Sequence, residues 1–205
     1  MNIITLSRQF GSGGRELGKR LADALGYDYY DREIIAAVAE KSELSPDFVE
    51  DAMQSGWQSG TMTFRHTLGA AVYAQSAQVS LLLRQKEVIE SIAAAGRDFI
   101  IVGRSADVIL REHNPLNIFV CATQEAKLKR CLDHAPEGES LTEKELLRQM
   151  KRIDKVRAQT RALICGADWG RPEQYHLTIN TTDFDIKQLV PAVAEFAVCR
   201  FGSMK

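Results

Sequence analysis

A short glycine-rich segment near the amino terminus has residue types that hold phosphate groups. Residues 11–16 read Gly-Ser-Gly-Gly-Arg-Glu and follow an apolar run at 3–6. Glycines let backbone N–H groups turn towards an anion, and the first turn of a following helix adds the positive end of its dipole. The segment therefore predicts a phosphate site made by Gly11, Ser12, Gly13, Gly14, Arg15 and Glu16, with a glycine-rich turn that binds nothing as the alternative.

This segment departs from the usual phosphate loop, G-x-x-x-x-G-K-[ST]. Aligned without gaps, Gly14 stands where the loop carries Lys, Arg15 stands where the Mg²⁺-binding hydroxyl belongs, and Arg8 takes the place of the first glycine. A shift by one residue would place Arg15 at the Lys position and Glu16 at the hydroxyl position. In either register we expect Arg15 to supply the positive charge, because a guanidinium binds phosphate through two N–H groups.

A second group of charged residues lies in the helical pattern at 142–165. Arg157 and Arg161 are four residues apart, which places them on one helix face. Two guanidiniums on one face repel each other unless an anion lies between them. The oxygens of a triphosphate are such an anion, and arginines there stabilise the charge that develops in phosphoryl transfer. The alternative is a solvent-exposed charged helix, which most charge runs form.

Strands and helices alternate along the chain and must position these residues. Apolar runs predict strands at 3–6, 27–30, 99–103, 117–122 and 176–182. Helical spacing and breakers predict helices at 15–25, 32–41, 67–95, 106–113, 123–133, 142–165 and 185–199, a further helix starting at 45–53, and an exposed loop at 55–66. This order predicts an α/β protein with a mainly parallel sheet covered by helices on both faces, whose ligands bind at the carboxyl ends of the strands.

The composition is typical of a soluble protein of one domain. The 205 residues are 45% hydrophobic, and 26 basic against 27 acidic residues give a net charge of −1, which argues against a general nucleic-acid binder.

The sequence has no signal-peptide pattern and no apolar run near the roughly 20 residues that cross a bilayer, so we expect a cytoplasmic protein without a membrane partner. Its cysteines and histidines show no metal-ligand spacing, so no metal ligand is assigned. The helix at 67–95 could pack within the chain or against a second copy, which leaves a homodimer open.

The order and spacing of four segments resemble the cytidylate kinase-like family, a branch of the P-loop nucleoside monophosphate kinases. The segments are "ITLSRQFGSGG", "LGYDYYDREII", "IIVGRSAD" and "INTTDFDIKQLV", and the resemblance runs from about residue 2 to residue 197. It implies a P-loop NTPase-type parallel sheet flanked by helices, in one domain, 1–205, with a helical acceptor-binding segment at about 31–95 and a lid at about 137–172. It also implies phosphoryl transfer from ATP, with Mg²⁺, to a nucleoside monophosphate such as CMP or dCMP.

The same resemblance assigns residues to the acceptor pocket. Asp31 matches an Asp of that pocket, and Arg32 stands in for an Arg that the family carries a few positions later. The alternative for Asp31 is a helix N-cap. Arg104 matches the Arg of the family's Gly-Arg-Asp block, which binds the acceptor. Ser105 stands where the Asp is usual, so Asp107 is a candidate to replace it.

The resemblance also assigns the lid, and it leaves the activity open. Asp154 and Arg157 have the D-x-x-R spacing of the family's lid, with Asp154 orienting Arg157. An enzyme would use Arg15, aided by Arg157, as an electrostatic substitute for the absent Lys, with Arg157 and Arg161 closing over the transferred phosphoryl group. Two alternatives are a kinase for another small acceptor and a non-catalytic nucleotide-binding or regulatory module on the same fold, because the loop lacks both the Lys and the hydroxyl.

Overall fold

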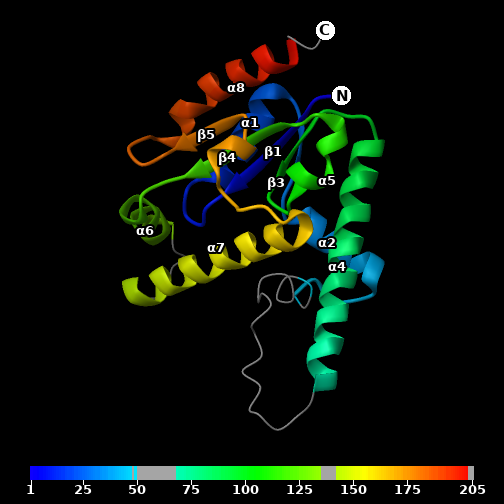
Figure 1. Cartoon of the computed structure of the whole chain (residues 1–205). Coiled ribbons are helices and arrows are strands. Elements are labelled where there is room, and N and C mark those ends of the chain that lie inside the picture. The colour runs from blue at the N-terminus through cyan, green and yellow to red at the C-terminus, as the bar shows by residue number, and fades with distance from the viewer. Residues whose placement is uncertain (48, 50–67, 135–141, 203–205) are drawn as a thin grey trace.

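The sheet of the computed structural model is fully parallel (Figure 1). The structure describes residues 1–47, 49, 68–134 and 142–202. The loop predicted at 55–66, most of the helix predicted to start at 45–53, and lid residues 137–141 lie outside these ranges. The strands, in the spatial order β2-β3-β1-β4-β5, are β1 (Ile3–Arg8), β2 (Asp28–Tyr30), β3 (Phe99–Val102), β4 (Leu116–Cys121) and β5 (Leu177–Asn180). The predicted α/β architecture is confirmed.

Helices cover both faces of this sheet because its central strands are apolar on both sides. Ile3 and Phe99 face a cluster shared with α2 (Glu33–Ser42), α4 (Leu68–Ala94) and α5 (Ala106–Ile109). Their chain neighbours Ile4 and Ile100 face the opposite cluster, shared with α1 (Gly14–Leu25) and α8 (Ile186–Gly202). The alternation follows from the two-residue period of a strand.

Two further helices lie near the carboxyl ends of the strands (Figure 1). They are α6 (Gln124–Asp133) and the long charged helix α7 (Glu143–Cys165). A capping box starts α7: the Thr142 hydroxyl accepts a hydrogen bond from the N–H of Glu145, and the Glu145 carboxylate accepts one from the N–H of Thr142. Gly166 ends the helix with φ +66. These signals place the charged helix where the sequence predicted it.

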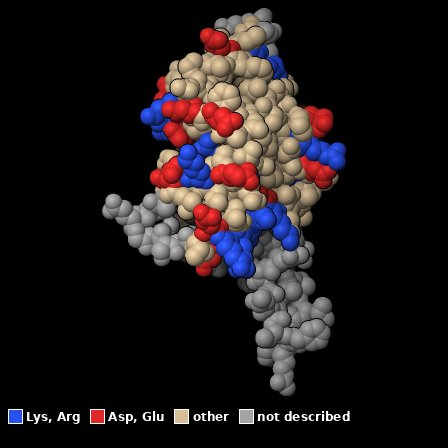
Figure 2. All heavy atoms as spheres, turned by 90° about the vertical axis from the view of Figure 1, so that its left-hand side faces the viewer, with Lys and Arg blue, Asp and Glu red and all other residues tan. Residues whose placement is uncertain are grey.

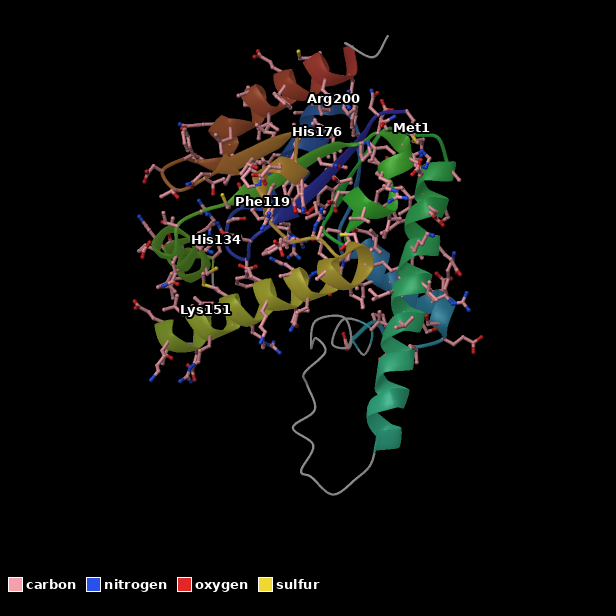
Figure 3. The ribbon with its side chains drawn as sticks, in the orientation of Figure 1. Met1, Phe119, His134, Lys151, His176 and Arg200 are labelled. Atoms are coloured by element: carbon pink, nitrogen blue, oxygen red, sulfur yellow. The ribbon has the colours of Figure 1, made fainter. Side chains whose placement is uncertain are left out.

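The segment that follows α7 is fixed against β4 by aromatic packing. Phe119 of β4, labelled in Figure 3, makes an edge-on contact with Trp169, with ring centroids 5.3 Å apart. It also packs on Tyr175, at a centroid distance of 4.9 Å. Gly170 lies so close to the Phe119 ring that an added Cβ would be 2.9 Å from its Cζ. This anchored segment continues through the short helix η2 (Pro172–Gln174) into β5.

The surface of the described part is mixed in charge. On the face shown in Figure 2, acidic and basic side chains are interspersed, in keeping with the net charge of −1. Another short helix, η1 (Arg111–His113), leads into β4. Within the described ranges, none of the helices combines the length and the apolar character that crossing a bilayer requires.

Candidate active site

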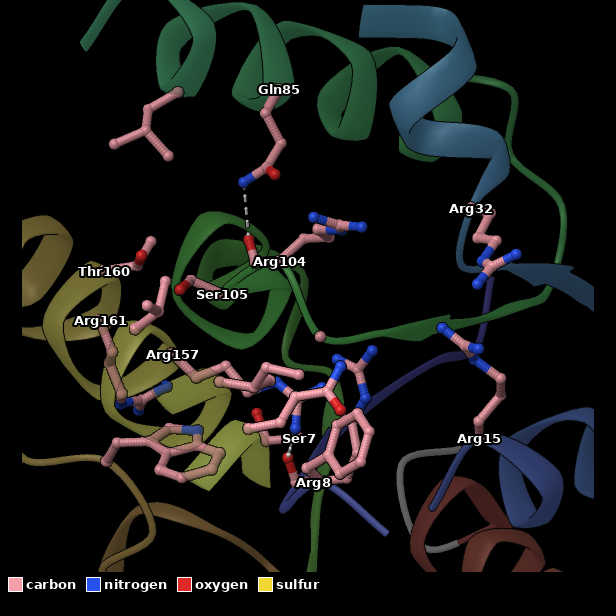
Figure 4. Close-up of a pocket in the computed structure, with 17 residues that line it drawn as sticks. Ser7, Arg8, Arg15, Arg32, Gln85, Arg104, Ser105, Arg157, Thr160 and Arg161 are labelled. Atoms are coloured by element: carbon pink, nitrogen blue, oxygen red, sulfur yellow. Dashed lines mark hydrogen bonds between the residues drawn. The ribbon is translucent and has the colours of Figure 1, made fainter. Parts of the chain in front are cut away.

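The carboxyl ends of β1 and β3 and one face of α7 enclose a pocket of about 320 Å³ (Figure 4). Arginine side chains converge on it from distant parts of the chain. Those that the structure describes are Arg8, Arg15, Arg32, Arg104, Arg157 and Arg161. Among the described residues that line this pocket, none is an aspartate, a glutamate or a histidine. Such a lining suits a ligand that carries several negative charges.

A larger pocket, of about 850 Å³, adjoins the first and contains the glycine segment. All six residues predicted for the phosphate site line it: Gly11, Ser12, Gly13, Gly14, Arg15 and Glu16. Arg8, Arg15, Arg32 and Arg157 line both pockets. The two pockets therefore meet at a group of arginines, so that ligands in the two pockets would share these charges.

The glycine segment is tightly packed from behind by α6 and α8. An added Cβ on Gly11 would lie 2.8 Å from the Sγ of Cys131, and one on Gly13 would lie 2.5 Å from the Cδ1 of Ile186. Gly13 also has φ +78, a conformation that glycine adopts without strain. Close packing against α6 and α8 therefore requires glycine at positions 11 and 13, independently of any phosphate binding. α1 starts at Gly14, and the N–H groups of Gly14, Arg15 and Glu16 precede the first helical hydrogen bond, which Leu17 donates to Gly13, so they are available to an anion.

Two residues of α7 are hydrogen-bonded to the backbone of the segment before Gly11. Asp154 accepts a hydrogen bond from the N–H of Phe10 at 2.8 Å. Arg157 donates to the carbonyl oxygen of Arg8 at 2.9 Å and to Asp154 at 3.1 Å. The predicted Asp154–Arg157 pair is present. Burial lowers the pKa of Arg157 despite the Asp154 carboxylate beside it, so a second anion in the pocket would stabilise the guanidinium.

Asp31 is not a helix N-cap. Arg32 holds the N-cap position of α2, where no side chain caps the helix, and the buried Asp31 carboxylate is bonded elsewhere. One oxygen lies 2.5 Å from the Nε of Arg15, and the other lies 3.5 Å from an Nη of Arg8. The N-cap alternative fails because a carboxylate beside two guanidiniums gains more from these charges than from a helix N–H. Asp31 therefore orients two of the pocket's arginines.

Arg161 has its own counter-charge inside the protein. It forms an ion pair with Asp107, and both side chains are at least 94% buried. Its Nε donates to Gln174 at 3.1 Å, and its guanidinium lies over the Tyr175 ring. Burial lowers the pKa of Arg161, but the Asp107 carboxylate together with Tyr175 and Cys165 outweighs burial, so that the pKa is raised. Since Asp154 and Asp107 balance Arg157 and Arg161 separately, the two arginines do not need a shared anion to coexist.

The residues after β3 adopt an unusual turn at the pocket. Gly103, Arg104 and Ser105 all have positive φ, at +77, +61 and +51. Such a conformation costs on the order of 1 kcal/mol for each non-glycine residue, so the surroundings must hold it. The buried Gln85 of α4 does so by donating from its Nε2 to the carbonyl oxygen of Arg104 at 3.0 Å (Figure 4). The turn brings Arg104 to the lining of the pocket.

Sequence reasoning missed residues that hold the site from a distance. Arg130 of α6 donates to the carbonyl oxygens of Gly11 and Thr181, at 2.9 and 3.2 Å, and so ties the glycine segment to the end of β5. Gln85 was hidden in a long helix without a motif. The sequence shows only that Arg130 is a basic residue on the helix after β4. It does not reveal which loop the Arg130 side chain contacts.

The described residues do not fit a magnesium ion held by the protein alone. They contain no group of three or more His, Cys, Asp or Glu side chains that could bind a metal. The Asp31 oxygens are bonded to guanidiniums, and Glu16 is paired with Arg20 at 2.7 Å. Mg²⁺ commonly binds through one or two carboxylates together with substrate phosphates, so it would enter this site with a nucleotide.

Comparison with known proteins agrees with this architecture. The model of the cytidylate kinase-like family matches residues 3–183, so the chain belongs to that family. An uncharacterized protein from Eubacterium ventriosum ATCC 27560 is 23% identical with a TM-score of 0.69, over 96% of this chain and 98% of that one. A shikimate kinase from Bacteroides thetaiotaomicron is 14% identical with a TM-score of 0.55, over 95% and 97%. A sugar kinase from Janibacter sp. HTCC2649 is 15% identical with a TM-score of 0.54, over 95% and 93%.

These identities show the fold alone, and the fold is that of the P-loop-type kinases, as the sequence predicted. No curated protein sequence matches the chain.

Proposed function

We propose that this member of the cytidylate kinase-like family transfers the γ-phosphoryl group of ATP to a small acceptor that already carries a phosphate, with CMP or dCMP as the first candidates. One observation carries the proposal: the pocket at the glycine segment and the arginine pocket adjoin, and four arginines line both. Donor and acceptor phosphates bound in these pockets would meet at those arginines.

The donor belongs in the larger pocket. Gly11 to Gly14 and the first turn of α1 offer backbone N–H groups and the positive end of a helix dipole to the triphosphate. Arg15 adds a charge at the mouth of this pocket, where its side chain is 55% exposed and is oriented by Asp31. The pocket volume of about 850 Å³ lies within the usual range for small-molecule sites.

The lining of the smaller pocket favours a phosphate as the acceptor group. A hydroxyl acceptor has to lose a proton during transfer, which calls for a general base. The described lining contains arginines but no carboxylate or imidazole, and both oxygens of the nearby Asp31 face guanidiniums. A phosphate monoester is largely a dianion at neutral pH, because its second pKa is about 6, so its oxygen can attack without a base.

The transfer then needs positioning and charge neutralisation. An acceptor phosphate oxygen forms a bond to the γ-phosphorus while the bond from that phosphorus to the β,γ-bridging oxygen breaks, and ADP leaves with the electron pair. Charge accumulates on the transferred group and on the leaving oxygen. Arg157 lines both pockets and is held by Asp154. We assign it the stabilisation of that charge.

A non-catalytic nucleotide-binding module is the second candidate. The first observation in its favour is that Gly14 and Arg15 stand where usual phosphate loops have a Lys and a hydroxyl residue. The second is that Asp154 and Arg157 of α7 are hydrogen-bonded to the backbone at Phe10 and Arg8, directly before the glycine segment. Such a protein would bind ATP but transfer nothing.

A coupled assay of ADP release separates the two candidates. With ATP and Mg²⁺, we expect turnover that depends on one or more of CMP, dCMP, UMP, AMP and GMP, and none with shikimate, whose phosphorylation takes place at a hydroxyl. Calorimetry with ATP runs beside the assay. ATP binding without acceptor-dependent turnover would favour the non-catalytic module, and turnover with shikimate alone would contradict the phosphate-acceptor assignment.

Gln85 offers a test of the acceptor pocket. Replacing Gln85 by alanine removes the hydrogen bond to Arg104 and leaves a strained turn without its support. We expect a loss of about 1–3 kcal/mol in the free energy of unfolding. The KM of the acceptor should rise by more than that of ATP, because the turn lies at the smaller pocket. Urea denaturation and steady-state kinetics measure both effects.

The matched control for this change is Lys86→Ala, the next residue of α4, whose exposed side chain pairs with Glu90. It should behave like the wild type. Equal increases in the two KM values for Gln85→Ala would show that the turn does not act on the acceptor in particular.

A further inference from the structure

The geometry points to Arg8 as the cation that contacts the transferred phosphoryl group, in the role that Lys has in the usual phosphate loop. This inference rests on the proposed function. It gives Arg8 the part that the sequence pattern alone had suggested for Arg15. It also accounts for the arginine at position 8 and the glycine at position 14, where the usual loop has a glycine and a Lys.

The exchange is visible in the register of the motif. Arg8 stands where the usual loop has its first glycine, and Gly14 stands where that loop has Lys. The loop therefore has one long cation and one glycine at these two positions, as the usual loop does, but in the opposite order. Arg8 is the last residue of β1, so its backbone is fixed by the pairing of that strand with β4.

Steric contacts make the two substitutions depend on each other. An added Cβ on Gly14 would lie 2.6 Å from the Cβ of Arg8 and 3.1 Å from its Cγ. Since real Cβ atoms essentially never come within 3.0 Å of another heavy atom, a side chain at position 14 is incompatible with this position of Arg8. An added Cβ on Gly103 would overlap the guanidinium of Arg8 itself. Arg8 thus passes between two glycines, one from the phosphate loop and one from the turn after β3.

This path ends where the two pockets meet. Arg8 lines both of them, its side chain is 12% exposed, and it points into the group of arginines in Figure 4. Asp31 lies 3.5 Å away and is closer to Arg15, at 2.5 Å. Burial and then the neighbouring Arg157 lower the pKa of Arg8 to about 9, which leaves it protonated at neutral pH but poorly compensated. Phosphate oxygens between the pockets would supply the missing negative charge.

Arg15 also lines both pockets, but it differs from Arg8 in its exposure and in its contact with Asp31. Its side chain is 55% exposed, and it makes the shorter contact with Asp31. An exposed guanidinium with a short carboxylate contact contributes less to charge stabilisation than a buried one whose carboxylate lies farther away, because water and the carboxylate already screen it. We therefore expect Arg8 to dominate catalysis and Arg15 to assist in binding.

The test is to reverse the exchange. Three variants are compared with the wild type: Arg8→Gly, Gly14→Lys, and the double variant, which restores the first glycine and the Lys of the usual motif but keeps Arg15 at the hydroxyl position. We expect Arg8→Gly to lower kcat by about 10²-fold or more, the scale of a lost charge-stabilising group. Gly14→Lys alone should lower the thermal unfolding midpoint and weaken ATP binding, since the new side chain meets Arg8. The double variant should regain at least tenfold in kcat over either single variant and recover the unfolding midpoint relative to Gly14→Lys.

Additional variants separate charge from packing. Arg8→Met keeps most of the side-chain length without the charge, and it should lose nearly as much kcat as Arg8→Gly while unfolding close to the wild type. Arg15→Ala should lose less kcat than Arg8→Met. Arg152→Ala, which removes an exposed arginine of α7 outside both pockets, is the control and should be unchanged.

Each contrary result has a distinct meaning. A wild-type protein that turns over while Arg8→Met remains within twofold of it would overturn the role of Arg8 and leave the proposed function standing. Effects that simply add in the double variant, or a Gly14→Lys variant as stable and active as the wild type, would overturn the steric exchange. A wild-type protein that binds neither ATP nor inorganic tripolyphosphate in calorimetry would overturn the proposed function and this inference together.

Discussion

Replacing Arg157 by alanine should lower kcat by about 10²–10³-fold, the range measured when one charge-stabilising group is removed from an active site. Arg157 lines both pockets, and its guanidinium is held by Asp154 and by the carbonyl oxygen of Arg8. A side chain fixed in this way needs little reorganisation when charge develops on the transferred group. Acceptor-dependent ADP release, measured at saturating ATP, checks the expectation.

Two variants distinguish the charge of Arg157 from its contacts with the loop. Arg157→Lys keeps a positive charge but lacks the planar guanidinium that can bind phosphate oxygens through two N–H groups at once, so an intermediate kcat is expected. Arg152→Ala, on the exposed side of the same helix, should have no effect. If Arg157→Ala retained the kcat of the wild type, Arg157 would have no catalytic role, whatever its place in the pocket.

Removing Asp107 should produce a large loss of stability. The Asp107–Arg161 pair is almost completely buried, and a buried arginine without its carboxylate is left with an uncompensated charge. Breaking a buried pair in this way typically costs about 3–5 kcal/mol. For a chain of this size, Asp107→Ala should therefore lower the thermal unfolding midpoint by on the order of 10 °C. Calorimetry or circular dichroism during heating measures the change.

The double variant Asp107→Ala, Arg161→Met checks this explanation, because it removes the charge as well as its partner. It should be more stable than Asp107→Ala alone. Glu112→Ala, which breaks the exposed pair of Glu112 with Arg111, should change the midpoint very little. A double variant no more stable than the single one would mean that the loss comes from packing around Asp107 and not from the charge of Arg161.

The elements of the fold were predictable because their signals are local. The runs at 3–6 and 99–103 are apolar without alternation, which is typical of strands buried on both faces, and both are central strands. Gly26 ends α1 with φ +69, and Thr142 caps α7, as a glycine and a threonine at such positions do. β1 nevertheless extends beyond the apolar run to Arg8, because hydrogen bonding to β4 continues where the hydrophobic pattern stops.

The sequence by itself determined the parallel α/β fold, the glycine segment and the chain positions of the arginines. Only the tertiary structure decided what those residues contact. Asp31 joins Arg15 and Arg8 instead of capping a helix, and Arg161 finds a carboxylate 54 positions away. Local spacing cannot reveal such partners, because they depend on which strands lie side by side and on where α7 crosses them. For the same reason, the sequence does not show that the side chain of Arg8 needs glycine at positions 14 and 103. These steric contacts arise only because β3 and the loop after β1 lie side by side in the fold.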